Sequence, residues 1–284
     1  MKGFARTLII AAVSLGVIGA APAAADPPPT AQVPLQLSLG DSWAAGFGAS
    51  APSEAYVPQL HAALREDLDC SRAGPGLSES GCPQLGLLNV AVGGATTPSM
   101  VATQFPQAIP VLEARNGNLN PRDDVEVVTL HIGGNDVNGP ILEACLGSLP
   151  ETCLSTIQSE LADYREDLDP ALSMLREAAG SDTAIVIGTY DNPFRDQSPT
   201  TCVLAGNPFV IALGDLVLEG GPGVPQGLHD IMRAVAADYE IQVAEVFNDL
   251  GEPEDWFDCL HPTDLGYDKV TDAFLEVFAF EPSA

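Results

Sequence analysis

The sequence predicts an α/β protein in which one parallel β-sheet is covered by helices on both faces. Short apolar runs with β-strand composition alternate along the chain with longer stretches of helical periodicity, and this alternation favours a parallel sheet. The first three of these runs each end in a glycine-containing turn with polar side chains. Because sites in open parallel sheets form at the carboxyl ends of strands, these turns should converge on one functional edge.

Residues 1–25 have the parts of a secretory signal peptide. Two basic residues precede the apolar run LIIAAVSLGVIGA, and the alanines at 23–25 suit cleavage after them. The run is short for a membrane span, and no cysteine follows the cleavage site to carry a lipid. We therefore expect a secreted, extracellular chain with no stable membrane anchor, in which residues 26–34 form a proline-rich segment before one domain at residues 35–284.

In the first half of that domain, the sequence predicts three strands and a helix. The first strand is LQLSLG at residues 35–40, and it is followed by a helix because apolar residues recur every fourth position. The recurring residues are Tyr56, Leu60, Leu64 and Leu68. The second and third strands are LGLLNVAV at residues 85–92 and DVEVVTLHI at residues 124–132.

The second half continues the alternation. Helical spacing recurs at Leu161, Arg165 and Asp169 and is followed by a predicted strand at residues 183–190. Residues 192–226 are rich in Pro and Gly but contain FVIALGDLVL, so we expect a helix within a long irregular excursion. The remaining predicted elements are a helix at residues 228–239, a strand at residues 240–247 and a helix at residues 268–278.

Polar side chains in four places suggest nucleophilic chemistry. Ser42 follows the first strand in the turn Gly40-Asp41-Ser42, where it could be a presented nucleophile or merely part of a helix cap. The turns Asn89–Thr97 and His131–Val137 follow the next two strands. Near the C-terminus, Asp258 precedes His261 by three residues, a spacing at which a carboxylate can reach Nδ1 of the imidazole.

These four places resemble the sequence blocks of SGNH, or GDSL-type, hydrolases, and most of all those of secreted actinobacterial lipases and esterases. The blocks are Gly40-Asp41-Ser42, Asn89 with Gly94, Gly133-Gly134-Asn135-Asp136, and Asp258-Cys259-Leu260-His261-Pro262. The resemblance covers residues 35–280 and implies a three-layer α/β/α sandwich with a flavodoxin-like parallel sheet of about five strands. Trp43 stands where the motif name has leucine, a departure that we expect to affect the shape of the pocket rather than the chemistry.

The resemblance also implies a mechanism. Ser42 would attack an ester carbonyl while His261 takes its proton and Asp258 fixes the imidazole tautomer. The backbone N–H groups of Ser42 and Gly94 and the side-chain amide of Asn135 would form the oxyanion hole. An acyl-enzyme would form and be hydrolysed by water, with no metal and no organic cofactor.

Other polar residues have structural interpretations. We expect His131 to pack beside the sheet, and His61 and His229 to be surface or structural histidines. Asp41 and Asp136 should hydrogen-bond local backbone, as these residue types do in turns. Asn89 and Thr96 should brace the second turn.

All six cysteines lie in the exported part, which predicts three disulfides in an oxidising compartment. Fifteen pairings are possible. Short separations suggest Cys70–Cys82 and Cys145–Cys153, which leaves Cys202–Cys259, and the resembling lipases also pair their cysteines in sequential order. No C-x-x-C pair suggests zinc, and the acidic stretch GEPEDWFD at residues 251–258 lacks EF-hand spacing, so we expect a solvated loop there.

The formal net charge of −28 argues against nucleic acid and anionic membranes as partners. We expect a monomer that acts on a small-molecule or lipid ester, with Phe194, Val203, Leu204 and Phe209 supplying apolar surface to an acyl pocket. One alternative is a carbohydrate O-deacetylase, although few aromatic residues are available as sugar platforms. An alternative of another class is a non-catalytic binding module on the same fold.

Overall fold

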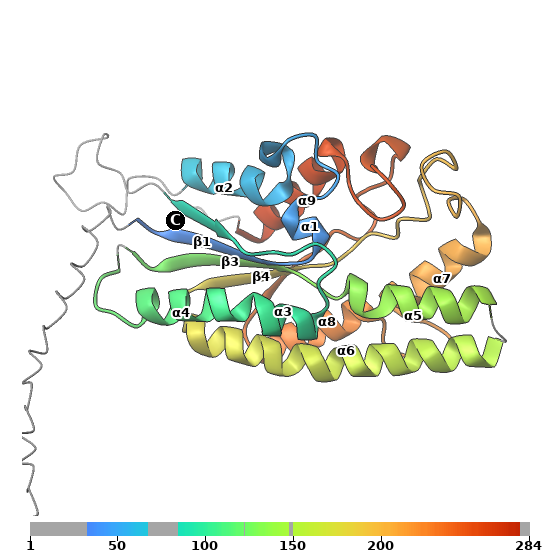
Figure 1. The fold of residues 1–284 in the computed structure, drawn as a ribbon, viewed down its shortest axis with the longest axis horizontal. Coiled ribbons are helices and arrows are strands. Elements are labelled where there is room, and N and C mark those ends of the chain that lie inside the picture. The colour runs from blue at the N-terminus through green and yellow to red at the C-terminus, as the bar shows by residue number, and fades with distance from the viewer. Residues whose placement is uncertain (1–32, 68–84, 122, 148–149, 279–284) are drawn as a thin grey trace, which may run out of the picture. The chain divides into compact units, whose positions relative to one another are not determined.

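The computed structural model describes residues 33–67, 85–121, 123–147 and 150–278, which contain one five-stranded sheet (Figure 1). The strands are β1 (Leu35–Gly40), β2 (Gly86–Asn89), β3 (Val125–His131), β4 (Ala184–Gly188) and β5 (Gln242–Ala244). Every pair of neighbours is parallel, and their order is β2-β1-β3-β4-β5. This is the flavodoxin-like order, so the expected fold class is confirmed.

Helices cover both faces of the sheet. One layer contains α1 (Ser42–Ala45), α2 (Tyr56–Asp67) and α9 (Asp264–Phe278). The other contains α3 (Thr97–Thr103), α4 (Phe105–Asn116), α5 (Gly134–Gly147), α6 (Pro150–Ala179), α7 (Pro208–Glu219) and α8 (Leu228–Asp238). Two short 3-10 helices lie at Pro52–Glu54 and Pro253–Asp255.

The core explains why these residues form these elements. All six residues of β1 are buried, as expected for a parallel strand with helices on both faces. On α2, Tyr56, Leu60 and Leu64 form the predicted apolar stripe against the sheet, and the fourth predicted residue, Leu68, lies outside the described residues. Helix α6 has 30 residues, and its buried residues run from Ile157 to Ala179. The helical spacing seen in the sequence, from Leu161 to Asp169, covered only part of this length.

Every strand after β1 is shorter than predicted, and local features shorten β2 and β5 most. Strand β2 ends at Asn89 because its side-chain oxygen accepts from the backbone N–H of Ala91 at 3.0 Å, which turns the chain. Strand β5 has three residues, since Glu240 closes α8 in the left-handed region at a φ of 54° and the strand begins only at Gln242.

Two of the three expected disulfides join described residues. Cys145–Cys153 links the last turn of α5 to the first turn of α6, and Cys202–Cys259 links the excursion before α7 to the loop before α9. The third pair, Cys70–Cys82, lies outside the described residues, as do the expected signal peptide and most of the proline-rich segment. None of the described helices is long and apolar enough to cross a membrane.

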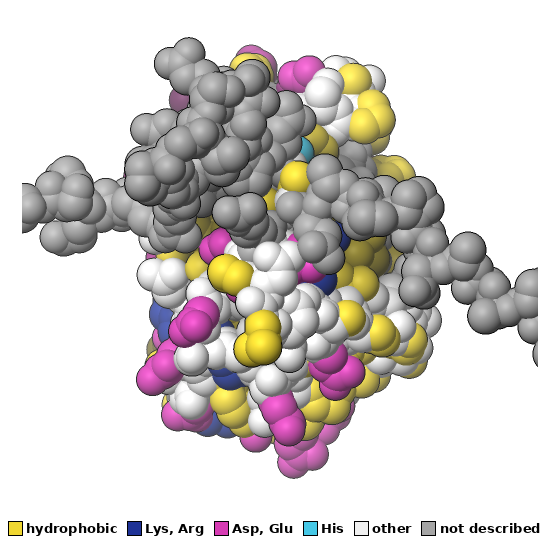
Figure 2. All heavy atoms as spheres, turned by 90° about the vertical axis from the view of Figure 1, so that its left-hand side faces the viewer, with side chains coloured by type: hydrophobic (Ala, Val, Ile, Leu, Met, Phe, Trp, Pro, Cys, Tyr) yellow, Lys and Arg dark blue, Asp and Glu magenta, His cyan; other side chains and the backbone are white. Residues whose placement is uncertain are grey.

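Acidic side chains dominate the charged surface on the face shown in Figure 2. Several basic residues are engaged in contacts of their own. Arg233 pairs with Glu219, Asp230 and Glu245, whereas Arg176 donates to four backbone carbonyls.

Candidate active site

Ser42 follows strand β1 in a turn that requires glycine. Gly40 has a φ of 134°, and a Cβ there would overlap the backbone oxygen of His131 on β3. Asp41 then caps helix α1, because its Oδ1 accepts from the backbone N–H of Trp43 at 2.9 Å. The two interpretations of this turn are therefore compatible: Asp41 is the cap, and the half-buried Ser42 is the first helical residue at the carboxyl edge of the sheet.

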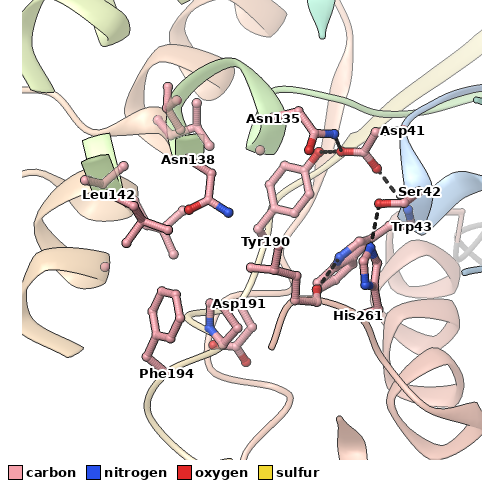
Figure 3. A pocket seen from close by; sticks show the side chains of 18 of the residues that line it. Asp41, Ser42, Trp43, Asn135, Asn138, Leu142, Tyr190, Asp191, Phe194 and His261 are labelled. Atoms are coloured by element: carbon pink, nitrogen blue, oxygen red, sulfur yellow. Dashed lines mark hydrogen bonds between the residues drawn. The ribbon is translucent and has the colours of Figure 1, made fainter. Parts of the chain in front are cut away.

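The Ser42 hydroxyl reaches the loop that contains His261 (Figure 3). Its Oγ lies 2.9 Å from Nε2 of His261, and Nδ1 of the same ring lies 2.8 and 2.9 Å from the two carboxylate oxygens of Asp258. In this arrangement the serine donates to Nε2, and Nδ1–H donates to the carboxylate. The structure thus brings together the three residues that the sequence suggested for a triad.

Asp258 is held by the turn that it starts. Its Oδ1 also accepts from the backbone N–H groups of Leu260 at 2.8 Å and His261 at 2.9 Å. Burial works to raise the pKa of Asp258, but these hydrogen bonds and the His261 side chain outweigh it, so the pKa lies below its usual value. The ionised carboxylate favours the tautomer that presents the Nε2 lone pair to Ser42.

The acidic stretch at residues 251–258 is exposed at residues 251–254 and 257, as expected for a solvated loop, but two of its residues are buried. Asp255 is buried and accepts from Nζ of Lys269 on α9 at 2.6 Å. Its neighbour Trp256 is buried as well. Close by, the Phe47 ring packs against the His261 ring, with 4.5 Å between the ring centroids. The prediction missed these two buried residues because it counted charges without the lysine and aromatic residues that the fold places near them.

Gly94 lies in the turn after β2 and Asn135 in the first turn of α5, and both line the same pocket as Ser42. Gly94 is left-handed with a φ of 77°, and a Cβ there would meet nothing within 4 Å, so the conformation rather than crowding favours glycine. Asn135 donates from Nδ2 to the backbone oxygen of Ala95 at 3.0 Å. Their assignment to an oxyanion hole remains a prediction.

Side chains tie these turns to each other across the sheet. The Asp136 carboxylate accepts from the backbone N–H of Thr97 at 2.9 and 3.1 Å, a partner on another element that we did not expect. Asn89 donates to the backbone oxygen of Ala44 at 2.8 Å and so braces α1 as well as its own turn. Thr96 caps α3.

Asp41 and Tyr190 form a buried pair that sequence reasoning missed. The Tyr190 hydroxyl donates to Oδ2 of Asp41 at 2.6 Å, in addition to the local bond that Asp41 was expected to accept (Figure 3). Burial raises the pKa of Asp41 to about 7, although the bond from Tyr190 opposes that rise. A polar aromatic residue just after the fourth strand, at the edge where the other turns meet, was the available signal.

The other three histidines lie away from Ser42. His131 is buried beside the sheet, as expected, and its Nε2 contacts the backbone oxygen of Thr189 at 2.9 Å. His229 is buried between Glu219 and the backbone N–H of Tyr190, and His61 contacts the backbone oxygen of Leu85. No three His, Cys, Asp or Glu side chains in the described part of the chain gather as a metal site would need.

A pocket of about 440 Å³ opens from Ser42 and His261 between α5 and α7. Its apolar lining includes Val137, Ile141 and Leu142 of α5 and Val210, Leu213, Val217 and Leu218 of α7. Of the four residues expected in such a pocket, only Phe194 lines it. Val203 and Phe209 are exposed, and Leu204 packs beside Cys202.

Comparisons with known proteins agree with this arrangement. A sequence model of the GDSL-like lipase/acylhydrolase family matches residues 38–269. An extracellular lipase from Streptomyces rimosus has 18% identity and a TM-score of 0.55, covering 86% of this chain and 99% of its own. A lipase from a goat rumen metagenome has 15% identity and a TM-score of 0.58, with coverages of 86% and 97%.

An acetylxylan esterase from Geobacillus stearothermophilus also shares the fold, with 15% identity, a TM-score of 0.52, and coverages of 87% and 95%. At such identities these solved structures show the likeness of the fold alone. No curated protein sequence matches the chain significantly.

Proposed function

The chain belongs to the GDSL-like lipase/acylhydrolase family, and from this we propose that it is a secreted carboxylester hydrolase with Ser42, His261 and Asp258 as its catalytic triad. The observation that carries the proposal is the unbroken chain of contacts from Ser42 Oγ through both imidazole nitrogens to Asp258, at the mouth of an apolar pocket.

In the proposed reaction, Ser42 Oγ attacks the ester carbonyl carbon while Nε2 of His261 takes the hydroxyl proton. Asp258 stabilises the imidazolium that forms. His261 then gives the proton to the departing alcohol, which leaves an acyl group on Ser42. A water molecule, deprotonated by the same nitrogen, attacks this acyl-enzyme and releases the acid and the free serine.

The negative charge on the carbonyl oxygen needs donors in both steps. We assign this role to the backbone N–H groups of Ser42 and Gly94 and to the Asn135 amide, which line one side of the pocket. Preorganised donors of this kind stabilise the transition state because they need no reorientation when the charge develops.

The pocket supports an acyl chain as the apolar part of the substrate. Its walls on α5 and α7 are mainly aliphatic, and a volume of about 440 Å³ falls in the usual range for small-molecule sites. An acetyl group would leave most of this surface unfilled, so the pocket favours a lipid or longer-chain ester over an O-deacetylase substrate. The contacts between Ser42 and His261 likewise favour an enzyme over a binding module.

Secretion is part of the proposal. Two disulfides in the described residues and the signal-like sequence at residues 1–25 support an oxidising, extracellular setting. The strongly negative net charge further favours neutral esters over anionic lipids as substrates.

A fluorophosphonate probe combined with an ester panel tests the proposal. We expect stoichiometric labelling of the wild type, none of Ser42→Ala, and a higher kcat/KM for p-nitrophenyl esters of medium or long acids than for the acetate. An acetylated polysaccharide belongs in the same panel. If the enzyme preferred that polysaccharide, the proposed substrate class would change from acyl-chain esters to acetylated carbohydrates. Equal labelling of the wild type and Ser42→Ala would show that Ser42 is not the nucleophile.

A further inference from the structure

Tyr190 connects two segments that the proposed mechanism uses separately. Its hydroxyl group donates to Asp41, which directly precedes Ser42, and its side chain packs beside Gly134, which directly precedes Asn135. The ring lies so close to Gly134 that a Cβ there would approach two ring carbons at 3.2 Å. One side chain from the end of β4 therefore fixes the spacing between the nucleophile turn and the proposed oxyanion turn.

Asp41 forms the other half of this connection. Its Oδ1 is occupied by the backbone N–H of Trp43, while its Oδ2 accepts from Tyr190 and lies 3.5 Å from Nδ2 of Asn135. Asn135 has two amide hydrogens, and one of them is committed to Ala95. The other faces Asp41 at the outer limit of hydrogen-bond distance, so it remains available to a substrate oxygen.

The Asp41 side chain has little freedom other than what these partners allow. Asp41 is 2% exposed, so protein groups rather than bulk water satisfy its oxygens. Trp43, Tyr190 and Asn135 each donate toward the Asp41 side chain, and the Tyr190 bond is the shortest of the three at 2.6 Å. Without it, the carboxylate could rotate toward Asn135 and compete for the hydrogen that the oxyanion needs.

We propose that Tyr190 is a positioning residue of the oxyanion hole: its hydroxyl holds the Asp41 carboxylate at the distance that aims the Asn135 amide without capturing it. This inference rests on the proposed function. It assigns no contact between Tyr190 and substrate atoms, although the ring lines the pocket.

The variant Tyr190→Phe removes the hydroxyl and keeps the ring, which also packs against Trp43 and His131. We expect kcat to fall by roughly 10 to 100-fold with little change in KM, the loss typical of removing a partner that orients a functional side chain. Tyr164→Phe is the matched control. Its ring packs against Gly133 as Tyr190 packs against Gly134, but its buried hydroxyl donates to the backbone oxygen of Ile132.

A double-mutant cycle separates positioning from a general structural effect. Asn135→Ala alone should lower kcat by about 10² to 10³, the cost of one oxyanion donor. If Tyr190 acts through Asn135, adding Tyr190→Phe to that variant should have little further effect on kcat. Multiplied losses in the double variant, or equal losses in Tyr190→Phe and Tyr164→Phe, would overturn the inference.

An NMR measurement makes the inference independent of turnover. The side-chain amide resonances of Asn135 can be assigned by their disappearance in Asn135→Ala. They should shift in Tyr190→Phe and stay in place in Tyr164→Phe, and unshifted resonances in the former would refute the positioning role. If the resonances shift but the wild type hydrolyses no ester, the proposed function is wrong while the positioning of Asn135 by Tyr190 still stands.

Discussion

The indole nitrogen of Trp43 donates a hydrogen bond of 2.9 Å to the backbone oxygen of Leu260. Trp43 directly follows Ser42, and Leu260 directly precedes His261, so the bond joins the two loops next to the atoms that must meet. Leucine, which the motif name has at this position, cannot donate it. We expected the tryptophan at this position to affect only the shape of the pocket. It also holds the Ser42 and His261 loops together.

Replacing Trp43 with phenylalanine should lower kcat by up to about 100-fold, because small misplacements of reacting groups cost that much. Trp256→Phe is the control. It removes an indole N–H from the same aromatic cluster, but that group donates to Leu250 and not to the His261 loop. Steady-state kinetics and melting temperatures of both variants provide the comparison, and equal losses of kcat would contradict a specific tether.

Replacing Ser42 with alanine should lower kcat by roughly 10⁴ to 10⁶, since members of a triad act as a unit. The fold should persist, because the cap of α1 is the Asp41 side chain and the Ser42 hydroxyl contacts only the His261 ring among the interactions described. Circular dichroism should therefore match the wild type. A variant that keeps wild-type turnover would exclude Ser42 as the nucleophile.

The strands were predictable because parallel strands buried on both faces form nearly continuous apolar runs, as AIVIG of β4 does. Helices α4 and α5 were not predicted, because Pro110 and Pro140 lie inside them and proline normally argues against a helix. In this fold, long-range packing against α6 holds them in place despite these residues.

The proposed triad and oxyanion residues carry local motifs, so the resemblance could locate them. Tyr190 carries no motif, and only the pairing of β4 beside β3 brings it to Asp41. The acyl pocket was predicted only in part. The segment at residues 192–226 does supply one wall, but α7 directs Val210 and Leu213 into the pocket and leaves Phe209 exposed. Helix rotation of that kind depends on tertiary packing that no short sequence stretch encodes.

Leu213→Phe should shift the enzyme toward short acyl chains. Leu213 lines the pocket from α7, and a larger side chain removes space that a long chain would fill. We expect the ratio of kcat/KM for palmitate to that for acetate to fall by roughly tenfold, as a few methylene contacts of about 0.8 kcal/mol each would give. Phe209→Leu, on the exposed side of the same helix, should leave the ratio unchanged.

His131 should make stability depend on pH in the acidic range. Burial lowers its pKa from 6.5 to about 3 in the folded protein. The unfolded chain therefore binds a proton below about 6.5 while the folded protein does not. The stabilisation associated with the neutral imidazole is fully present above pH 6.5 and is lost as the pH falls toward 3.

Urea unfolding of the wild type and His131→Gln at several pH values tests this sign. The free energy of unfolding of the wild type minus that of the variant should decrease between pH 6.5 and 3. Asp41, with its pKa raised to about 7, contributes the opposite slope as the pH rises, but it is present in both proteins and cancels in the difference. A difference that grows as the pH falls would contradict the buried neutral state of His131.

The disulfide Cys202–Cys259 ties a wall of the pocket to the His261 loop. Cys202 lies in a small buried cluster with Phe194 and Val210, and Leu260 of the His261 loop packs against that cluster. Phe194 and Leu260 both line the pocket. Closing 57 residues should stabilise the protein by about 4 kcal/mol on the chain-entropy account of disulfides.

Removing this bond by Cys202→Ala with Cys259→Ala should abolish turnover at temperatures where circular dichroism is still native, because the loop loses its covalent anchor before the core unfolds. Cys145→Ala with Cys153→Ala is the control: it removes a link between α5 and α6, so turnover and circular dichroism should decline together. If both double variants lose turnover only on unfolding, Cys202–Cys259 is a structural link without a role in placing His261.

Peptide mapping without reduction checks the pairing itself and also tests the predicted Cys70–Cys82 bond.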